Sequence, residues 1–289
     1  MIPKIPLGYA ADLFVNFLIE HLSMVFDAIT LIFSGVIIAL ENFLSSFHPI
    51  VLIVLLCLII WFITRKETAI LSFFGLFLIY DLNLWPELIK TFVLVLIATS
   101  VALIISIPIG IWMTRNDLVK RVTMPILDFM QTMPSFVYLI PAAMLFGIGE
   151  VPGLFATVIF ATPPPVRLTY LGITQVPEDL KEMASSFGAT DRQVLTKVEL
   201  PLSLPSLMTG INQCIMLGIS MVVIASMIGA GGLGGVVLRA VNRLDMGMGF
   251  EGGIAIVILA IVLDRTSRGM GEYRETPLNK LIVRVIKKF

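Results

Sequence analysis

The chain has 289 residues, of which 57% are hydrophobic and only 14% are charged. Soluble domains usually carry about 25% charged residues, so this composition excludes a water-soluble protein and predicts an integral membrane protein. The 20 basic and 20 acidic residues cancel, which removes the electrostatic basis for binding nucleic acid. Two cysteines, Cys57 and Cys214, are too few for a zinc site or a disulfide framework.

The first 44 residues are expected to form an external N-terminal segment that is retained. Met1 to Glu20 holds a single lysine and is interrupted by Pro3 and Pro6, unlike a cleavable signal peptide. A helix is predicted over Leu22–Phe43, because Phe26, Ile29, Phe33, Val36, Leu40 and Phe43 recur at helical spacing. Since this helix also carries Asp27 and Glu41, we favour an amphipathic helix on the outer membrane face; an eighth span is the alternative.

About seven membrane spans are predicted from stretches that lack Asp, Glu, Lys and Arg, since a crossing helix needs about 20 apolar residues. They are Asn42–Thr64, Thr68–Tyr80, Thr91–Thr114, Phe129–Gly149, Val151–Val166, Leu202–Leu238 and Met246–Leu263. The expected fold class is therefore all-α. Residues 45–84 are interpreted as an accessory hairpin, 85–266 as the core and 267–289 as a basic cytoplasmic tail.

The distribution of basic residues predicts the orientation, because Lys and Arg near span ends collect in the cytoplasm. If the loops after the first, third, fifth and seventh spans are internal, only Lys4, Lys90, Arg239 and Arg243 lie outside. The N-terminus is then expected outside and the C-terminus inside.

The longest polar interruption of the apolar pattern is residues 176–207. Pro177 followed by two acids indicates a helix start, Gly188 indicates its end, and Thr190 is the expected N-cap of a second short helix. An apolar stripe follows these helices: Leu180, Met183, Ala184, Phe187, Val194, Leu195 and Val198. Such a stripe needs a partner, either the chain's own span ends or another protein.

Within this loop the spacing of Glu182-Met183-Ala184, Gly188, Val198 and Leu200-Pro201 resembles the EAA loop of ABC importer permeases. The resemblance implies an ABC importer permease fold and a coupling helix that docks on a cytoplasmic ATPase. The residues that it assigns to coupling are Glu182, Met183, Ala184, Phe187, Gly188, Val198, Leu200 and Pro201.

Three further stretches, Asp128–Pro134, Phe136–Pro141 and Met221–Ala230, are similar to permeases of the glycine betaine and proline betaine importers of the OpuA/ProU type. This implies a bacterial plasma-membrane permease for a quaternary ammonium osmoprotectant, acting as a homodimer with two ATPase subunits and an external binding protein. The chain has no G-x-x-x-x-G-K-[ST] loop, so ATP and Mg are expected on the partner ATPase. No cofactor, metal or catalytic residue is expected in this chain.

Polar residues and prolines within predicted spans are candidates for the solute pathway or its gate, because irregular helices at membrane depth line cavities. They are Asp128, Gln131, Thr132, Pro134, Ser135, Tyr138, Arg167, Asn212, Gln213 and Ser220. Interhelical hydrogen bonding is the alternative. A carboxylate in a span is costly when unpaired, so Asp128 is expected to pair with Arg167, with an inner-gate role as the second possibility.

Other patterns are set aside. Residues 229–234 fit G-x-G-x-x-G, but they follow a predicted membrane helix instead of a strand, so we expect glycines that turn the backbone. The absence of G-x-S-x-G argues against an intramembrane hydrolase. The alternatives kept open are an importer of choline or an amino acid, and a passive osmotically gated channel.

Overall fold

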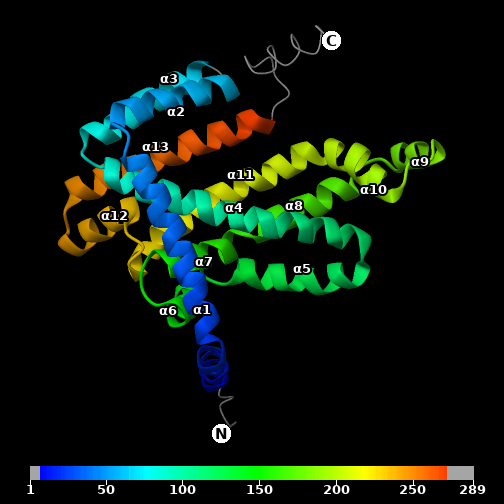
Figure 1. Ribbon diagram of the computed structural model, residues 1–289, viewed down its shortest axis with the longest axis horizontal. Coiled ribbons are helices and arrows are strands. Elements are labelled where there is room, and N and C mark those ends of the chain that lie inside the picture. Colours follow the sequence, from blue (N-terminus) through cyan, green and yellow to red (C-terminus); the bar gives the residue numbers. More distant parts are fainter. Residues whose placement is uncertain (1–6, 65, 272–289) are drawn as a thin grey trace.

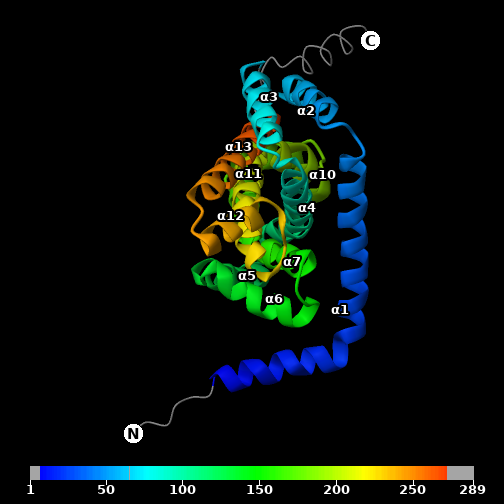
Figure 2. The same ribbon diagram turned by 90° about the vertical axis from the view of Figure 1, so that its left-hand side faces the viewer.

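The computed structural model describes residues 7–64 and 66–271, and every regular element in these residues is helical. Most of the long helices run side by side in one direction (Figures 1 and 2). One end of this bundle carries a helical loop, and the other end carries the turn before the last helix (Figure 1). Lys4 and most of the predicted basic tail lie outside the described residues.

The first helix, α1 (Leu7–Ser45), runs across the bundle instead of along it (Figures 1 and 2). It packs on the core through Ile37, which is fully buried, and through Phe33, whose ring centroid lies 5.2 Å from that of Phe155. Its length and composition would let it cross a membrane. Its crosswise direction favours the predicted helix on the membrane face over an eighth span, because a spanning helix would run with its neighbours.

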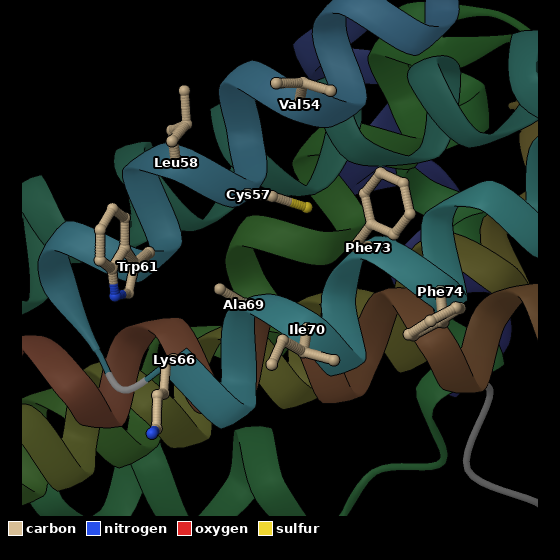
Figure 3. Close-up of a pocket in the computed structure, with 9 residues that line it drawn as sticks. All are labelled: Val54, Cys57, Leu58, Trp61, Lys66, Ala69, Ile70, Phe73 and Phe74. Carbon is tan, nitrogen blue, oxygen red and sulfur yellow. The ribbon is translucent and has the colours of Figure 1, made fainter.

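A helical hairpin follows, formed by α2 (Pro49–Ile63) and α3 (Lys66–Asp81). The prediction that the first span begins at Asn42 is wrong, because α1 continues to Ser45 and Pro49 opens α2 as an N-terminal proline. An open apolar crevice separates the outer faces of α2 and α3, and the Cys57 side chain points into it (Figure 3).

Three long helices form the centre of the bundle: α4 (Trp85–Arg115), α11 (Leu200–Ala225) and α13 (Met246–Gly271). Close approach between helices rests on small residues, as is usual in membranes. A Cβ atom added to Gly218 of α11 would lie 2.7 Å from Thr99 of α4. One added to Gly110 of α4 would lie 2.6 Å from Thr169 of α8 (Pro163–Thr174).

The predicted span Phe129–Gly149 is sharply bent, so this stretch is either a broken span or a re-entrant segment. The chain forms α5 (Asp117–Thr132), then a short 3₁₀ turn (Ser135–Tyr138) and α6 (Leu139–Phe146), with a bend of 108° between α5 and its continuation. Pro134 has no N–H to donate and holds Met133 in an extended conformation, with ψ of 136°. The helix therefore ends at Thr132, two residues before the proline.

The predicted span Val151–Val166 is two helices, α7 (Glu150–Ala161) and α8, with only Thr162 between them. Pro163 to Pro165 occupy the first turn of α8, where a missing N–H costs little. The predicted segment Leu202–Leu238 likewise becomes α11 followed by a short turn and α12 (Gly232–Arg243).

Four helices of the described residues are long and apolar enough to cross a membrane individually, or up to five if α5 and its bent continuation are counted together. This differs from the predicted seven. One of the four is α1, which was not among the seven predicted spans. Of those seven, α2 and α3 have only 15 and 16 residues, and breaks at prolines divide two others. The chain is an all-helical, multi-pass membrane protein.

Candidate coupling loop and polar helix face

The loop between α8 and α11 forms two short helices that project from one end of the bundle (Figure 1). They are α9 (Glu178–Ser186) and α10 (Asp191–Val194), and a single π-helical turn (Leu195–Glu199) joins α10 to α11. Such π turns are rare, and those that occur are frequently found at functional sites. None of the residues in α9 is buried.

Gly188 ends α9 as predicted, with φ of +81°. The Ala189 N–H donates to the Ala184 carbonyl at 3.1 Å, and the Gly188 N–H donates to the Ser185 carbonyl at 2.9 Å. This is a Schellman-type ending, in which a left-handed residue closes the helix. A side chain at this position would be strained whatever the free space around it.

Thr190 is the N-cap of α10, which confirms the prediction. The Gln193 N–H donates to Thr190 Oγ1 at 3.4 Å, and the Thr190 N–H donates to Gln193 Oε1 at 2.8 Å. The two residues form a reciprocal capping box. Local hydrogen bonds therefore define the turn at Gly188 and the start of α10.

The apolar stripe predicted along the loop divides into two parts. Val194 is buried, and Leu195 and Val198 are half-buried against the bundle. Met183 and Phe187 instead face outward, with 53% and 88% of their surfaces exposed. The first part thus packs on the chain's own helices, and the second part leaves a methionine and an aromatic ring largely exposed.

A residue that sequence reasoning missed ties this loop to the bundle. Glu199, the residue between Val198 and Leu200, forms a salt bridge with Arg115 at the end of α4. The Glu199 side chain is 3% exposed and the Arg115 side chain 43%. The sequence did hold a signal for this pair. An acidic residue lies inside the loop motif and a basic residue lies in the last turn of α4, and both were predicted on the cytoplasmic side of the membrane.

Asp128 and Arg167 form the predicted pair, joining α5 to α8. The carboxylate side chain is 66% exposed, and the arginine Nε is buried without a hydrogen-bond partner. Nearby, the Tyr138 hydroxyl donates to the Met130 carbonyl across the bend after α5. Gln131, Thr132 and Pro134 are exposed at this bend, and Ser135 is half-buried.

The candidates on α11 lie on two different sides of the helix. Asn212 faces α13, where its amide donates to Asp264 Oδ1 at 3.0 Å and its carbonyl oxygen accepts from Ser267 at 2.7 Å. Gln213 and Ser220 are exposed together with Thr209, opposite the buried side of the helix. Asn212 therefore joins two helices, whereas the other three form a polar face on the outside of the single chain.

The glycines of residues 229–234 form a turn, as predicted. Gly229, Gly231 and Gly232 have positive φ, and α12 begins at Gly232 directly after them. The Leu233 N–H donates to Thr91 Oγ1 at 2.8 Å, which anchors the start of α12 on α4. No strand precedes this segment in the part of the chain that the structure describes.

Comparison with known proteins identifies relatives of the whole chain. Residues 106–268 match the family described as binding-protein-dependent transport system inner membrane component. The chain is 48% identical to the glycine betaine/carnitine transport permease protein GbuB of Listeria monocytogenes, covering 94% of this chain and 97% of that protein. It is 44% identical to the glycine betaine transport system permease protein OpuAB of Bacillus subtilis, covering 93% and 95%.

Two further similarities extend the comparison. The chain is 47% identical to the glycine betaine/proline betaine transport system permease protein ProW of Escherichia coli, covering 83% of this chain and 70% of that protein. Among solved structures, a chain of the inward-facing MetNI methionine ABC transporter superposes with a TM-score of 0.57 at 20% identity, covering 63% of this chain and 93% of that one. The structural similarity concerns the fold alone.

Proposed function

The chain belongs to the family of inner membrane components of binding-protein-dependent transport systems, and on this premise we propose that it is the permease subunit of an ATP-driven importer of glycine betaine or a related quaternary ammonium osmoprotectant. The substrate class rests on relatives of nearly the same length at 44% to 48% identity, whose names specify glycine betaine. An importer of choline or an amino acid would also carry an EAA-like loop, but the relatives favour the betaine.

The observation that carries the importer mechanism is the outward-facing pair Met183 and Phe187 on a loop of fixed shape. Two large apolar side chains on a polar loop predict a contact with another protein. Their position at the basic end of the bundle supports a cytoplasmic partner, because basic residues near span ends collect in the cytoplasm. We assign the partner as the ATPase subunit, which would bind ATP and Mg.

The Glu199 salt bridge supplies a route from that contact to the spans. Movement of α9 and α10 would be transmitted through the π turn to α11, and through Glu199 and Arg115 to the end of α4. An ATPase can shift the permease between outward-open and inward-open states only if it binds the two states with different affinity. A loop held by its own hydrogen bonds and an ion pair with a buried carboxylate suit that purpose, because they move with the helices that they join.

A second copy of the chain is proposed to cover the polar face of α11. The Gln213 amide would otherwise face the hydrocarbon, where an unsatisfied polar group is costly. Thr209 and Ser220 lie on the same face, and their hydroxyls donate to the Pro205 and Met216 carbonyls at 2.9 and 3.1 Å. In a homodimer these side chains would face either the partner or a solute pathway between the two copies. The complete assembly would contain two permeases, two ATPases and an external binding protein.

The proposed localisation is the bacterial plasma membrane, with the N-terminus outside and the C-terminus in the cytoplasm. The end of the bundle that carries α9 and α10 also carries the ends of α4 and α8, and the C-terminal end of α13 points toward the same side (Figure 1). The basic residues of those ends, including Arg115 and Arg268, therefore gather at one side of the membrane. The positive-inside rule makes that side cytoplasmic.

Co-purification with the ATPase tests this function directly. Phe187→Glu is expected to abolish capture of the ATPase by the permease, because a carboxylate replaces the most exposed ring of the loop. Leu244→Glu is the matched control, since Leu244 is 92% exposed at the opposite end of the bundle. Equal capture of the ATPase by both variants would contradict the docking role of α9.

A further inference from the structure

An apolar cavity of about 310 Å³ separates the α2–α3 hairpin from the core helices α4, α11 and α13. The hairpin packs on the core mainly through α13, whereas α2 makes at most slight contact with α4. The cavity occupies the space between these two helices. It extends along α4 from Trp85 to Leu96, a distance of about 16 Å at 1.5 Å per residue.

Water is disfavoured in this cavity. Among its lining residues only Thr266 and Ser267, with hydroxyls, and Trp85, with an indole N–H, carry polar side-chain groups. The Thr266 hydroxyl donates to the Val262 carbonyl at 2.6 Å, and the Ser267 hydroxyl donates to Asn212 at 2.7 Å. Since an ordered water needs 2–4 polar partners, the site favours an apolar occupant.

An empty cavity is also unfavourable, because the side chains around it lose van der Waals contacts. The cavity is open at one side, so an apolar molecule could enter there and supply these contacts. Ile59 of α2 and Leu96 of α4 line the cavity and are 45% and 44% exposed, so they lie at its edge. In a multi-pass membrane protein, exposed apolar side chains at this position face the hydrocarbon chains of the bilayer.

We propose that a bilayer phospholipid inserts one acyl chain into this cavity through the opening between α2 and α4. The chain acts as a wedge that seats the hairpin on the core. Its length suits an extended groove of about 16 Å, and its apolar surface matches the lining. The proposal requires only that these helices lie in the membrane, so it stands independently of the transported solute and of the ATPase.

The occupant has a mechanical consequence. Because α13 contacts both α11 and the hairpin, a shift of α13 during transport would change the shape of the cavity. The acyl chain would then contact the two conformations differently. Such differential contact is the condition under which a ligand shifts an equilibrium between states.

Fluorescence of Trp85 tests the proposal, because this residue lines the cavity and is 6% exposed. The chain has three tryptophans, so Trp61→Phe with Trp112→Phe leaves Trp85 as the sole emitter. In vesicles of phospholipids with brominated acyl chains, Trp85 emission is expected to be strongly quenched relative to unbrominated vesicles. Unchanged emission would overturn the proposal.

A filled cavity supplies the decisive comparison. Leu56→Phe with Leu96→Phe places two rings in the cavity and is expected to abolish the quenching of Trp85. Leu55→Phe with Ile104→Phe adds the same volume to exposed positions of α2 and α4 outside the cavity, and should keep the quenching. Equal quenching in the filled and control variants would show that the bromines act from outside the cavity.

Native mass spectrometry of the purified chain gives a second measurement that does not depend on the filled variant. After extensive detergent washing, the chain with its natural cavity is expected to retain one phospholipid per copy. Retention of detergent alone, or a second copy of the chain without phospholipid, would contradict the proposal. Loss of the retained phospholipid in the filled variant, with retention in the control, would support it.

Discussion

Removing the Glu199 carboxylate is predicted to uncouple ATP hydrolysis from transport. The Glu199 side chain is 3% exposed, and its partner Arg115 is 43% exposed. Breaking a fully buried pair costs about 3–5 kcal/mol, but water can reach Arg115, so we expect about 2 kcal/mol for Glu199→Gln. If the pair is intact in only one transport conformation, this loss changes the ratio of conformations about 30-fold.

The assay is a reconstituted assembly in which ATP hydrolysis and solute uptake are measured on the same vesicles. Glu199→Gln and Arg115→Gln are each expected to lower uptake per ATP, and the exchanged pair, Arg115→Glu with Glu199→Arg, is expected to recover part of it. Arg121→Gln is the matched control, since Arg121 is exposed on α5 close to the same end. Unchanged uptake per ATP in both single variants, with normal assembly, would refute the coupling role.

Three further outcomes are expected. Gly188→Ala should weaken ATPase capture, because a Cβ at positive φ costs about 1 kcal/mol. Gly253→Ala is the control, since Gly253 lies in a helix with open space around it. Equal capture of the ATPase by the two variants would contradict the argument. Asn212→Leu should lower the melting temperature by removing both hydrogen bonds to α13, and an unchanged melting temperature would show that these bonds contribute little. An impermeant thiol reagent applied outside should label a cysteine at Asn83 but not one at Lys66; the reverse pattern would invert the proposed topology.

Local chemistry explains which parts of the fold could be predicted from the sequence. The loop helices were located correctly because Gly188 and Thr190 act on their immediate neighbours, through a helix ending and a capping box. The Asp128 and Arg167 pair was predictable because an unpaired charge at a span end is costly. The turn and the cap involve only neighbouring residues, whereas the pair was predicted from the cost of an unpaired charge and from the similar depth of the two span ends.

Long-range geometry was less accessible. Glu199 and Arg115 are 84 residues apart, and their pairing depends on how α4 and α11 are packed. The bend at Pro134 was hidden within an apolar run that satisfies the length of a span, since hydropathy does not record the direction of a helix. Asn212 and Gln213 are adjacent in the sequence, but only Asn212 contacts α13. The sequence pattern of α11 alone cannot show which of its sides α13 covers.

Solute accumulation in vesicles tests the central claim most directly. Vesicles that contain this chain alone are expected to hold a glycine betaine gradient without leakage, because an importer opens to one side at a time. Adding the ATPase, the binding protein and ATP should then produce accumulation against the gradient, and withholding ATP should prevent it. Rapid equilibration of the solute by the isolated chain would contradict the importer and identify a passive channel instead.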